Sequence, residues 1–373
     1  MTLWPTAALG DVSRPRQWPI LSKADMAASG FPVFGANGQI GFATSYTHKK
    51  PILLIGCRGS CGTVHVAPAL TYANGNAMAL DALDTRRVDL HFLAAFLKMR
   101  GFEDVISGSS QPQITRQNIV RVEVPLPPLD EQRRIAAVLD QAHALSRKRR
   151  EVLNQLDAFA RAIFDQMFGD PVGMTRGWPK VRFETLLKLP LRNGVSPASG
   201  GVVSATVLTL SAITGSRFEE RSTKVGEFKA SPSEHQRVNR SDFLICRGNG
   251  NKSLVGRGFF PEHDMPNVVF PDTIIAGRID TRRTAPAFLQ FVWNAPATRR
   301  QIEAKTRTTN GTFKVNQTMI EAVELVDPPL DLQRSFSEKL AAVEEQRSSY
   351  RRQLDSFDAL FASLQHRAFR GEL

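Results

Sequence analysis

The chain has 373 residues, enough for two or three domains, and its 42% hydrophobic and 23% charged residues are ordinary globular usage. This composition excludes a collagen-like, mucin-like or wholly disordered chain, and no apolar run has the length of a membrane span or a signal-peptide core. The net charge of +12 favours a polyanionic partner, and three cysteines are too few for a disulfide framework, which fits a reducing cytoplasm.

The first 128 residues predict a mixed α/β domain. Trp4-Pro5 opens it, and the apolar run Ile52–Arg58 predicts a buried strand that ends in arginine. Residues 89–101 predict a helix with Asp89 as its N-cap. A small polar loop, Ser107–Gln113, follows and leads through a strand into a Pro-Pro pair.

Residues 129–168 predict one long helix. Pro127 and Pro128 stand where proline is tolerated, in the first turn. Apolar residues then recur at alternating spacings of three and four up to Gly169, which is the pattern of a helix with one apolar stripe. Forty helical residues span about 60 Å, and a helix of that length with one stripe needs a partner.

The remaining residues repeat this order. Trp178-Pro179 opens the second region, Asp242–Arg247 predicts the strand, and residues 284–294 predict the helix with Thr284 as its N-cap. A second helical stretch covers residues 296–305, and the polar loop Thr306–Lys314 follows.

An internal repeat at an offset of 201 residues joins the two halves. PPLDEQR at Pro127–Arg133 matches PPLDLQR at Pro328–Arg334. The second motif begins another long helix, and the simplest arrangement pairs the two helices. The residues expected to pair them are Ile135, Leu139, Leu153 and Leu156 in the first helix and Phe336, Leu340, Leu354 and Phe357 in the second.

The charge follows the repeat. Residues 1–128 carry twelve basic and eight acidic side chains, and residues 169–326 carry twenty-two and fourteen. Residues 129–168 and 327–373 have net charges of +1 and −1. Two globular regions therefore hold the positive charge, and the two helices are nearly neutral.

These features together resemble the specificity subunit of type I restriction–modification systems. The duplicated PPLxEQ-like helix start carries the resemblance, together with the C-terminal LQHRAFRGEL and the motifs FGANGQIGF and DFLICRGNGNKSLVGR. Leu332 departs from the family, which usually has glutamate there. The resemblance implies an α+β fold, with target recognition domains at 1–128 and 169–327 and spacer helices at 129–168 and 328–373. The helices would form an antiparallel coiled coil with a pseudo-two-fold repeat.

The resemblance also implies a non-catalytic, cytoplasmic DNA-binding protein. Each recognition domain would read one half of a bipartite asymmetric site on double-stranded DNA. The helices would set the half-site spacing and dock two methyltransferase subunits. S-adenosylmethionine, ATP and Mg²⁺ would belong to those subunits and to restriction or motor subunits, with no cofactor or metal in this chain. The alternatives are a single-chain DNA-modifying enzyme and a non-catalytic scaffold of another DNA-defence complex.

Three patterns that suggest catalysis have simpler explanations. Asp327-Pro-Pro-Leu330 resembles an adenine-methyltransferase motif, but leucine replaces the aromatic residue that stacks on a flipped base. Gly248–Ser253 lacks the glycines of a phosphate-binding P-loop. Pro271-Asp272 with Glu303–Lys305 fits a nuclease pattern that is common by chance.

A possible metal site and a basic run of residues also have ordinary explanations. Cys57, Cys61 and His65 lack a fourth zinc ligand, which favours buried thiols. Arg147–Arg150 is typical of a solvated helix face, with contact to DNA between the half-sites as the alternative.

Two groups of polar residues are candidates for contact with DNA. Arginine and amide side chains can read base edges, and lysine and hydroxyl side chains can hold phosphates. The first group belongs to the loops before each Pro-Pro pair: Ser109, Ser110, Gln111, Gln113, Arg116, Arg307, Thr308, Thr309, Asn310 and Lys314. The second group follows the buried strands: Arg58, Arg247, Asn249, Lys252 and Arg257. Ordinary turn chemistry is the alternative for both.

Overall fold

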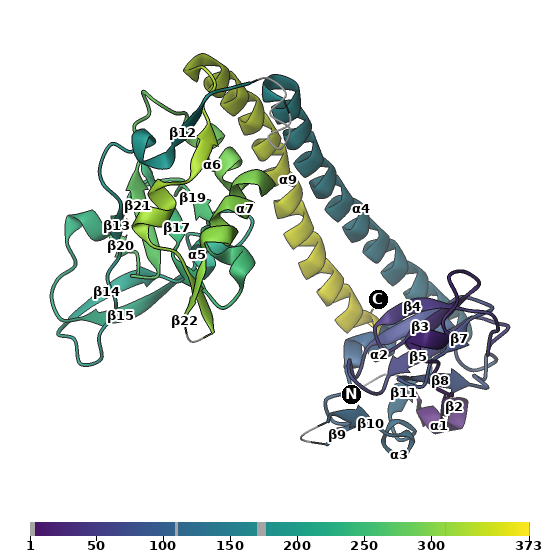
Figure 1. The fold of residues 1–373 in the computed structure, drawn as a ribbon. Coiled ribbons are helices and arrows are strands. Elements are labelled where there is room, and N and C mark those ends of the chain that lie inside the picture. Colours follow the sequence, from purple (N-terminus) through teal and green to yellow (C-terminus); the bar gives the residue numbers. More distant parts are fainter. Residues whose placement is uncertain (1–3, 109–110, 170–176, 310, 373) are drawn as a thin grey trace. The chain divides into compact units, whose positions relative to one another are not determined.

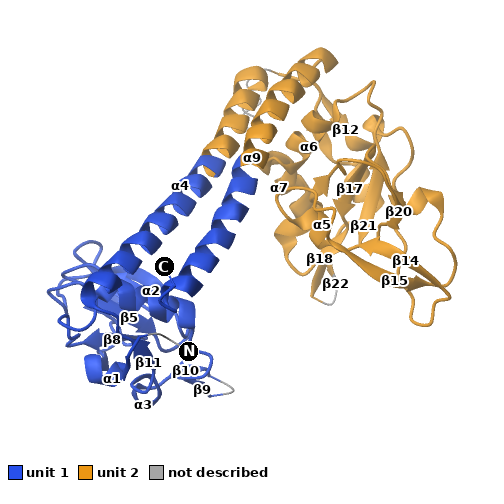
Figure 2. Cartoon of the chain, turned by 180° about the vertical axis from the view of Figure 1, so that it is seen from behind, with its two compact units in different colours: residues 1–153, 350–373 blue, residues 154–349 orange. Residues whose placement is uncertain are grey.

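The computed structural model describes residues 4–108, 111–169, 177–309 and 311–372. They form two compact units: unit 1 comprises residues 1–153 and 350–373, and unit 2 comprises residues 154–349. Both long helices contribute to both units, as the colour change along each helix shows (Figure 2). The predicted α+β class is confirmed, with β-rich domains and two long packed helices. Among the described residues, no helix is long and apolar enough to cross a lipid bilayer.

Unit 1 is built on a four-stranded sheet of order β2-β8-β5-β6 and a three-stranded sheet of order β4-β3-β7 (Figure 1). Its strands are β1 (Thr6–Ala8), β2 (Arg14–Gln17), β3 (Phe31–Gly35), β4 (Gly38–Ala43), β5 (Ile52–Gly56), β6 (Val64–Ala67), β7 (Tyr72–Ala73), β8 (Ala77–Asp81), β9 (Ile106–Ser107), β10 (Gln113–Ile114) and β11 (Glu123–Pro125). Its short helices are α1 (Leu9–Val12), α2 (Leu90–Arg100) and α3 (Arg116–Ile119), with a 3₁₀ turn at Lys23–Asp25.

The helix predicted at 89–101 is confirmed as α2, and Asp89 is its N-cap. The Asp89 carboxylate accepts hydrogen bonds from the backbone N–H groups of His91 (2.9 Å) and Phe92 (3.0 Å). Strand β5 is buried along its whole length, and Leu53 and Ile55 share a core cluster with residues of α2. The continuous apolar run in the sequence therefore marks a central strand, as in sheets covered on both faces.

Unit 2 contains two four-stranded sheets, of order β13-β21-β17-β19 and β15-β14-β20-β16, and a three-stranded sheet of order β18-β23-β22. Its strands are β12 (Lys180–Arg182), β13 (Arg192–Asn193), β14 (Val203–Leu208), β15 (Thr223–Phe228), β16 (Arg237–Val238), β17 (Asp242–Cys246), β18 (Gly248–Asn249), β19 (Gly258–Phe259), β20 (Met265–Val269), β21 (Ile274–Arg278), β22 (Arg307–Thr309), β23 (Thr312–Lys314) and β24 (Glu324–Val326). Its short helices are α5 (Ser211–Thr214), α6 (Pro286–Asn294), α7 (Pro296–Lys305) and α8 (Gln317–Glu321), with 3₁₀ turns at Phe183–Leu186, Glu234–Gln236 and Lys252–Leu254.

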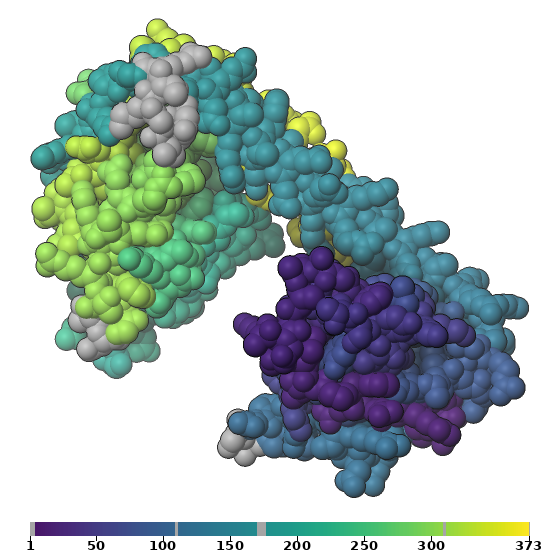
Figure 3. All heavy atoms as spheres, turned by 45° about the vertical axis from the view of Figure 1, so that its right-hand side comes forward, coloured from purple at the N-terminus to yellow at the C-terminus, as the bar shows by residue number. Residues whose placement is uncertain are grey.

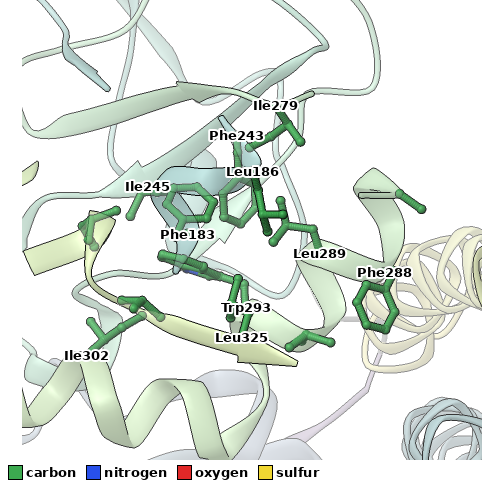
Figure 4. Packing of buried hydrophobic residues seen from close by; sticks show 14 of the residues in the cluster. Phe183, Leu186, Phe243, Ile245, Ile279, Phe288, Leu289, Trp293, Ile302 and Leu325 are labelled. Carbon is green, nitrogen blue, oxygen red and sulfur yellow. The ribbon is translucent and has the colours of Figure 1, made fainter. Parts of the chain in front are cut away.

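The core of unit 2 is rich in aromatic side chains. Trp293 of α6 packs against Phe183 and Phe243, with ring centroids 4.6 and 5.4 Å apart (Figure 4). The Trp293 indole N–H donates to the Gly256 carbonyl (2.7 Å), so this buried polar atom is satisfied. Phe288, on the same helix, belongs to a cluster that includes Phe164 and Phe336 of the long helices. Helix α6 therefore joins the core of the domain to the helix pair.

In each unit, the strand after the Trp-Pro pair closes against the strand that leads to Pro-Pro. Strand β1 pairs antiparallel with β11, and the Leu126 N–H donates to the Pro5 carbonyl (2.8 Å). Strand β12 pairs with β24 in the same way, and the Asp327 N–H donates to the Pro179 carbonyl (2.9 Å). The Trp-Pro pair that begins each half of the sequence therefore precedes the same strand pairing in both units.

The two long helices are α4 (Leu129–Phe168) and α9 (Leu330–Ala368). In unit 1, Ile135 and Leu139 at the start of α4 are buried with Ala368 at the end of α9. In unit 2, Phe336 and Leu340 at the start of α9 are buried with residues from the end of α4. The helices therefore run antiparallel in each unit. The other expected pairing residues, Leu153, Leu156, Leu354 and Phe357, are half-buried.

Between these apolar clusters the helices contact each other through polar groups. In unit 1, the Asp358 carboxylate accepts from the Ser146 hydroxyl (3.3 Å) and from the Arg150 guanidinium (3.1 Å). In unit 2, the Arg347 guanidinium is paired with Asp157. Since 157 and 358 differ by 201, the two aspartates occupy equivalent positions of the repeat. They fix which face of each helix turns inward.

The glutamine of the first PPLDEQR motif joins helix α4 to the β-rich part of unit 1. Gln132 is fully buried. Its amide nitrogen donates to the carbonyls of Arg87 and Pro127 (both 2.8 Å), and its amide oxygen accepts from the Asp89 N–H (2.8 Å). One side chain thus satisfies backbone groups at the starts of both α2 and α4, which would otherwise be buried without partners.

Gln333 does the same in unit 2, and it corrects the predicted cap of α6. The Gln333 amide oxygen accepts from the Ala285 N–H and from the Thr284 hydroxyl (both 3.0 Å). Its nitrogen donates to the Pro328 carbonyl (2.8 Å). The N-cap of α6 is therefore Ala285, and the prediction of Thr284 was wrong because the Thr284 hydroxyl binds the glutamine and caps no N–H.

We expect Gln132→Met to lower the free energy of unfolding by about 1–3 kcal/mol. Methionine keeps the approximate volume but leaves one N–H and two carbonyls buried without partners. Urea unfolding followed by circular dichroism measures the change. Gln155→Met, at an exposed position of the same helix, is the matched control and should change stability by less than about 0.5 kcal/mol. Equal losses in the two variants would contradict this role of Gln132.

Asp327, beside Gln333, predicts a pH dependence of stability. Burial raises the pKa of the Asp327 carboxyl, while Arg283 and the hydrogen bond from Gln333 act in the opposite direction. The folded chain therefore binds the proton more tightly than the unfolded chain, and ionisation of Asp327 costs stability as the pH rises.

Asp327→Asn should accordingly raise the melting temperature at neutral pH, because the amide carries no charge. The gain should vanish near about pH 3.5, where the ordinary aspartate carboxyl is already protonated. Thermal unfolding at both pH values tests this. A gain of equal size at both would have a cause other than ionisation.

Candidate nucleic-acid interface

A polar hairpin projects from unit 2. Strands β22 and β23 pair antiparallel, with Arg307 opposite Lys314 and Thr308 opposite Phe313. In Figure 3 the light-green atoms of this hairpin lie at one end of the unit. Arg307, Thr308 and Lys314 are exposed, so their side chains are available to a ligand.

The hairpin brings together residues that are far apart in the sequence. Strand β18 pairs with β23, with Gly248 opposite Lys314 and Asn249 opposite Phe313. The loop after the buried strand and the loop before Pro-Pro are therefore parts of one three-stranded sheet. Lys252 follows β18 and is exposed. We call the surface formed by β18, β22, β23 and Lys252 the unit 2 hairpin surface.

The cations of this surface have no acidic partners among the described residues. No ion pair within those ranges involves Lys252, Arg307 or Lys314. Arg307 and Lys314 are also directly opposite each other on neighbouring strands, an arrangement that costs stability when both are charged. An anionic ligand would offset that repulsion, so the surface suits a phosphate backbone.

Unit 1 has a corresponding hairpin from β9 and β10, with Gln113 opposite Ser107. Arg58, just after the buried strand β5, bridges to Gln113 from the other side. Arg58, Gln111, Gln113 and Arg116 are all exposed. We call the surface formed by Arg58, β9, β10, Gln111 and Arg116 the unit 1 hairpin surface.

The two hairpin surfaces share a backbone frame and differ in side chains. In unit 1 the three adjacent positions are Arg58, Gln113 and Ser107. In unit 2 the corresponding positions are Gly248, Lys314 and Arg307. Where unit 1 has Arg58, unit 2 has Gly248, and where unit 1 has Ser107, unit 2 has Arg307. A shared frame with different polar groups is suited to two different ligands of one chemical class.

Three candidates of the second group already have hydrogen-bond partners within the chain. The Arg247 guanidinium donates to the Asp272 carbonyl (3.1 Å). The Arg257 guanidinium donates to the carbonyls of Thr214 (2.9 Å) and Gly215 (3.0 Å) at the end of α5. The side-chain amide oxygen Oδ1 of Asn249 accepts from the Asn251 N–H (2.8 Å). The exposed cations are therefore the stronger candidates for contact with a ligand.

Some candidates lie outside what the structure describes. These are Ser109, Ser110 and Asn310, together with the side chain of Thr309. Ser107 was missing from the candidates predicted from sequence, although it belongs to the same loop. Its place opposite Gln113 depends on a strand pairing of two residues, too short to leave a pattern in the sequence.

Cys57, Cys61 and His65, which follow one another at four-residue intervals, each have a different hydrogen-bond partner. The Cys57 sulfur accepts from the Gln17 amide (3.0 Å), the Cys61 thiol donates to the Pro112 carbonyl (2.9 Å), and the His65 ring lies 3.0 Å from the Ala36 carbonyl. Cys57 is buried as predicted, but the prediction of a buried thiol is wrong for Cys61, which is half-buried and contacts Pro112 of the loop before β10. Cys246 is also buried, and burial raises the pKa of its thiol to about 11.

Comparison with known proteins shows which proteins the chain is similar to. Residues 1–156 match the family described as "Type I restriction modification DNA specificity domain". The chain is 24% identical over 302 residues to the EcoKI specificity subunit of Escherichia coli K12, and 23% identical over 309 residues to the StySPI specificity subunit of Salmonella potsdam. Each alignment covers 76% of this chain, and 64% and 65% of the length of those relatives.

A solved structure shows the same fold. The crystal structure of the type I restriction–modification S subunit from M. genitalium superposes with a TM-score of 0.64 at 15% identity, covering 99% of this chain and 96% of that one. The family match thus covers the first part of the chain, and the fold of the whole chain is similar to that of the S subunit. In this chain, the duplicated glutamine motifs, the helix pair and the two hairpin surfaces form one repeated plan.

If the unit 2 hairpin surface binds nucleic acid, we expect the double variant Arg307→Ala, Lys314→Ala to bind duplex DNA more weakly. If both cations contact phosphates, the slope of log K against log salt concentration should fall by about 2. Fluorescence anisotropy across a salt series measures it. Lys224→Ala, at an exposed lysine of β15 in a different sheet, is the control and should leave the slope unchanged. An unchanged slope in the double variant would remove these residues from the interface.

Proposed function

We propose that this chain is the non-catalytic DNA-specificity subunit of a type I restriction–modification complex. Each unit would read one half of a bipartite, asymmetric site on double-stranded DNA through its hairpin surface. The helix pair would hold the two readers at a fixed spacing and dock two methyltransferase subunits. A cytoplasmic location is part of this proposal.

The observation that carries the proposal is the repeated frame with different side chains. In both units a short hairpin before Pro-Pro pairs with the segment that follows a buried strand, through one bridge at Arg58 in unit 1 and through β18 in unit 2. Both surfaces leave cations without acidic partners within the described residues. Two different readers in one chain require no palindrome. Readers at a fixed separation require half-sites at a fixed separation along the duplex.

The helix pair supports the spacing role. Each helix is attached to a β-rich domain by a fully buried glutamine, and apolar clusters fix the helices against each other in both units. The near-neutral charge of the helices distinguishes them from the basic domains. They are therefore better suited to hold protein partners than to bind a nucleic acid backbone.

The chemistry of modification would belong to partner subunits. Among the described residues, no group of three or more histidine, cysteine, aspartate or glutamate side chains is arranged to hold a metal ion. S-adenosylmethionine would serve the methyltransferase subunits. ATP and Mg²⁺ would serve the restriction or motor subunits.

Mapping adenine methylation across the host genome tests the proposal. We expect deletion of this gene to abolish methylation at one split, asymmetric motif, and reintroduction of the gene to restore it. Exchange of Arg58, Gln113 and Arg116 for alanine should impair recognition of one half of that motif. An unchanged methylation map after deletion, in a host that expresses the complex, would contradict the proposed function.

A further inference from the structure

Each long helix has a large, exposed apolar side chain at an equivalent position of the repeat. Phe159 of α4 is 56% exposed and Leu360 of α9 is 53% exposed. They are 201 residues apart, the offset of the repeat. Phe159 belongs to unit 2 and Leu360 to unit 1, so each unit presents one of them.

Their orientation follows from the inward aspartates. Asp157 and Asp358 contact the other helix within their own units. A position two residues further along an α-helix is rotated by about 200°, to the opposite side. Phe159 and Leu360 therefore point away from the helix pair.

The surroundings of both residues are uncharged. Gln155, Ala158 and Ala162 lie beside Phe159 at helical spacing, and Ser356, Ala359 and Ser363 occupy the same positions around Leu360. All six are exposed. Each unit therefore has an outward patch in which small neutral residues surround one large apolar side chain.

Some exposed polar positions are the same in both repeats, such as Arg133 and Arg334. The other exposed large apolar residues described on the two helices have polar equivalents. Leu145 is 45% exposed and corresponds to Gln346, and Leu332 is 38% exposed and corresponds to Glu131. One exposed apolar residue is ordinary on a protein surface. Retention of a large one at the same exposed position of both repeats indicates a shared binding role.

We infer that Phe159 and Leu360 are the anchor residues for two copies of one protein partner, one copy on each patch. The inference rests on the proposed function, in which those copies are the methyltransferase subunits. Equivalent patches on one chain fit two identical partners, whereas self-association would need one self-complementary surface. An apolar side chain within a neutral surround enters a desolvated pocket of a protein and offers nothing to a phosphate backbone.

Native mass spectrometry of this chain co-expressed with the methyltransferase subunit of its own system tests the inference. The wild type should retain two copies. Phe159→Glu and Leu360→Glu should each retain one, and the double variant none, because a buried unpaired charge opposes docking. Phe159→Ala and Leu360→Ala should weaken binding of one copy by about tenfold, as expected for the loss of an anchor side chain.

Leu145→Glu is the matched control, since it places the same charge at an exposed leucine of the same helix that has no apolar equivalent. It should retain two copies. Circular dichroism and DNA binding should be unchanged in all variants, because the substituted positions are exposed. A wild-type chain that retains no copy would overturn the proposed docking together with this inference. Glutamate variants that retain two copies, or a Leu145→Glu variant that loses one, would overturn this inference alone.

Discussion

Two buried glutamines determine how the repeated plan is assembled. A side-chain amide that is fully buried must satisfy both N–H groups and its oxygen, or its desolvation costs more than its packing returns. Gln132 satisfies that requirement only if the start of α4, the start of α2 and the preceding loop lie together. Gln333 imposes the same requirement on unit 2. The orientation of each β-rich domain on its helix therefore depends on this hydrogen-bonded glutamine together with the apolar cluster beside it.

The contacts of the two long helices differ along their length. Their ends are apolar and buried against α2 in unit 1 and α6 in unit 2, while the stretch between these clusters is held by arginine, serine and aspartate. Polar contacts between helices depend more on geometry than apolar contacts do, so the two aspartates specify the rotation of each helix. That rotation turns Asp157 and Asp358 inward, and it turns Phe159 and Leu360 outward. The proposed docking positions are thus a consequence of the interhelical contacts.

The side chains of the hairpin surfaces are much less constrained by the core than the residues between the helices. Their strands are only two or three residues long, and they pair with the segments that directly follow the core strands β5 and β17. Such short edges can change side chains with little effect on the core. The same frame with different polar groups in the two units fits the proposal that each unit binds a different half-site.

The sequence by itself determined the repeat, the two long helices, the buried strands and the Asp89 cap, because these depend on periodicity and local capping, which a linear chain records. It did not reveal that the loop after each buried strand pairs with the loop before Pro-Pro, nor that Gln333 displaces Thr284 as a capping group. Those features require hydrogen bonds between residues roughly fifty or more positions apart, and no local preference encodes them. Only the tertiary structure separated Lys252, Arg307 and Lys314, which face solvent, from Arg247 and Arg257, whose guanidinium groups satisfy backbone carbonyls inside the protein.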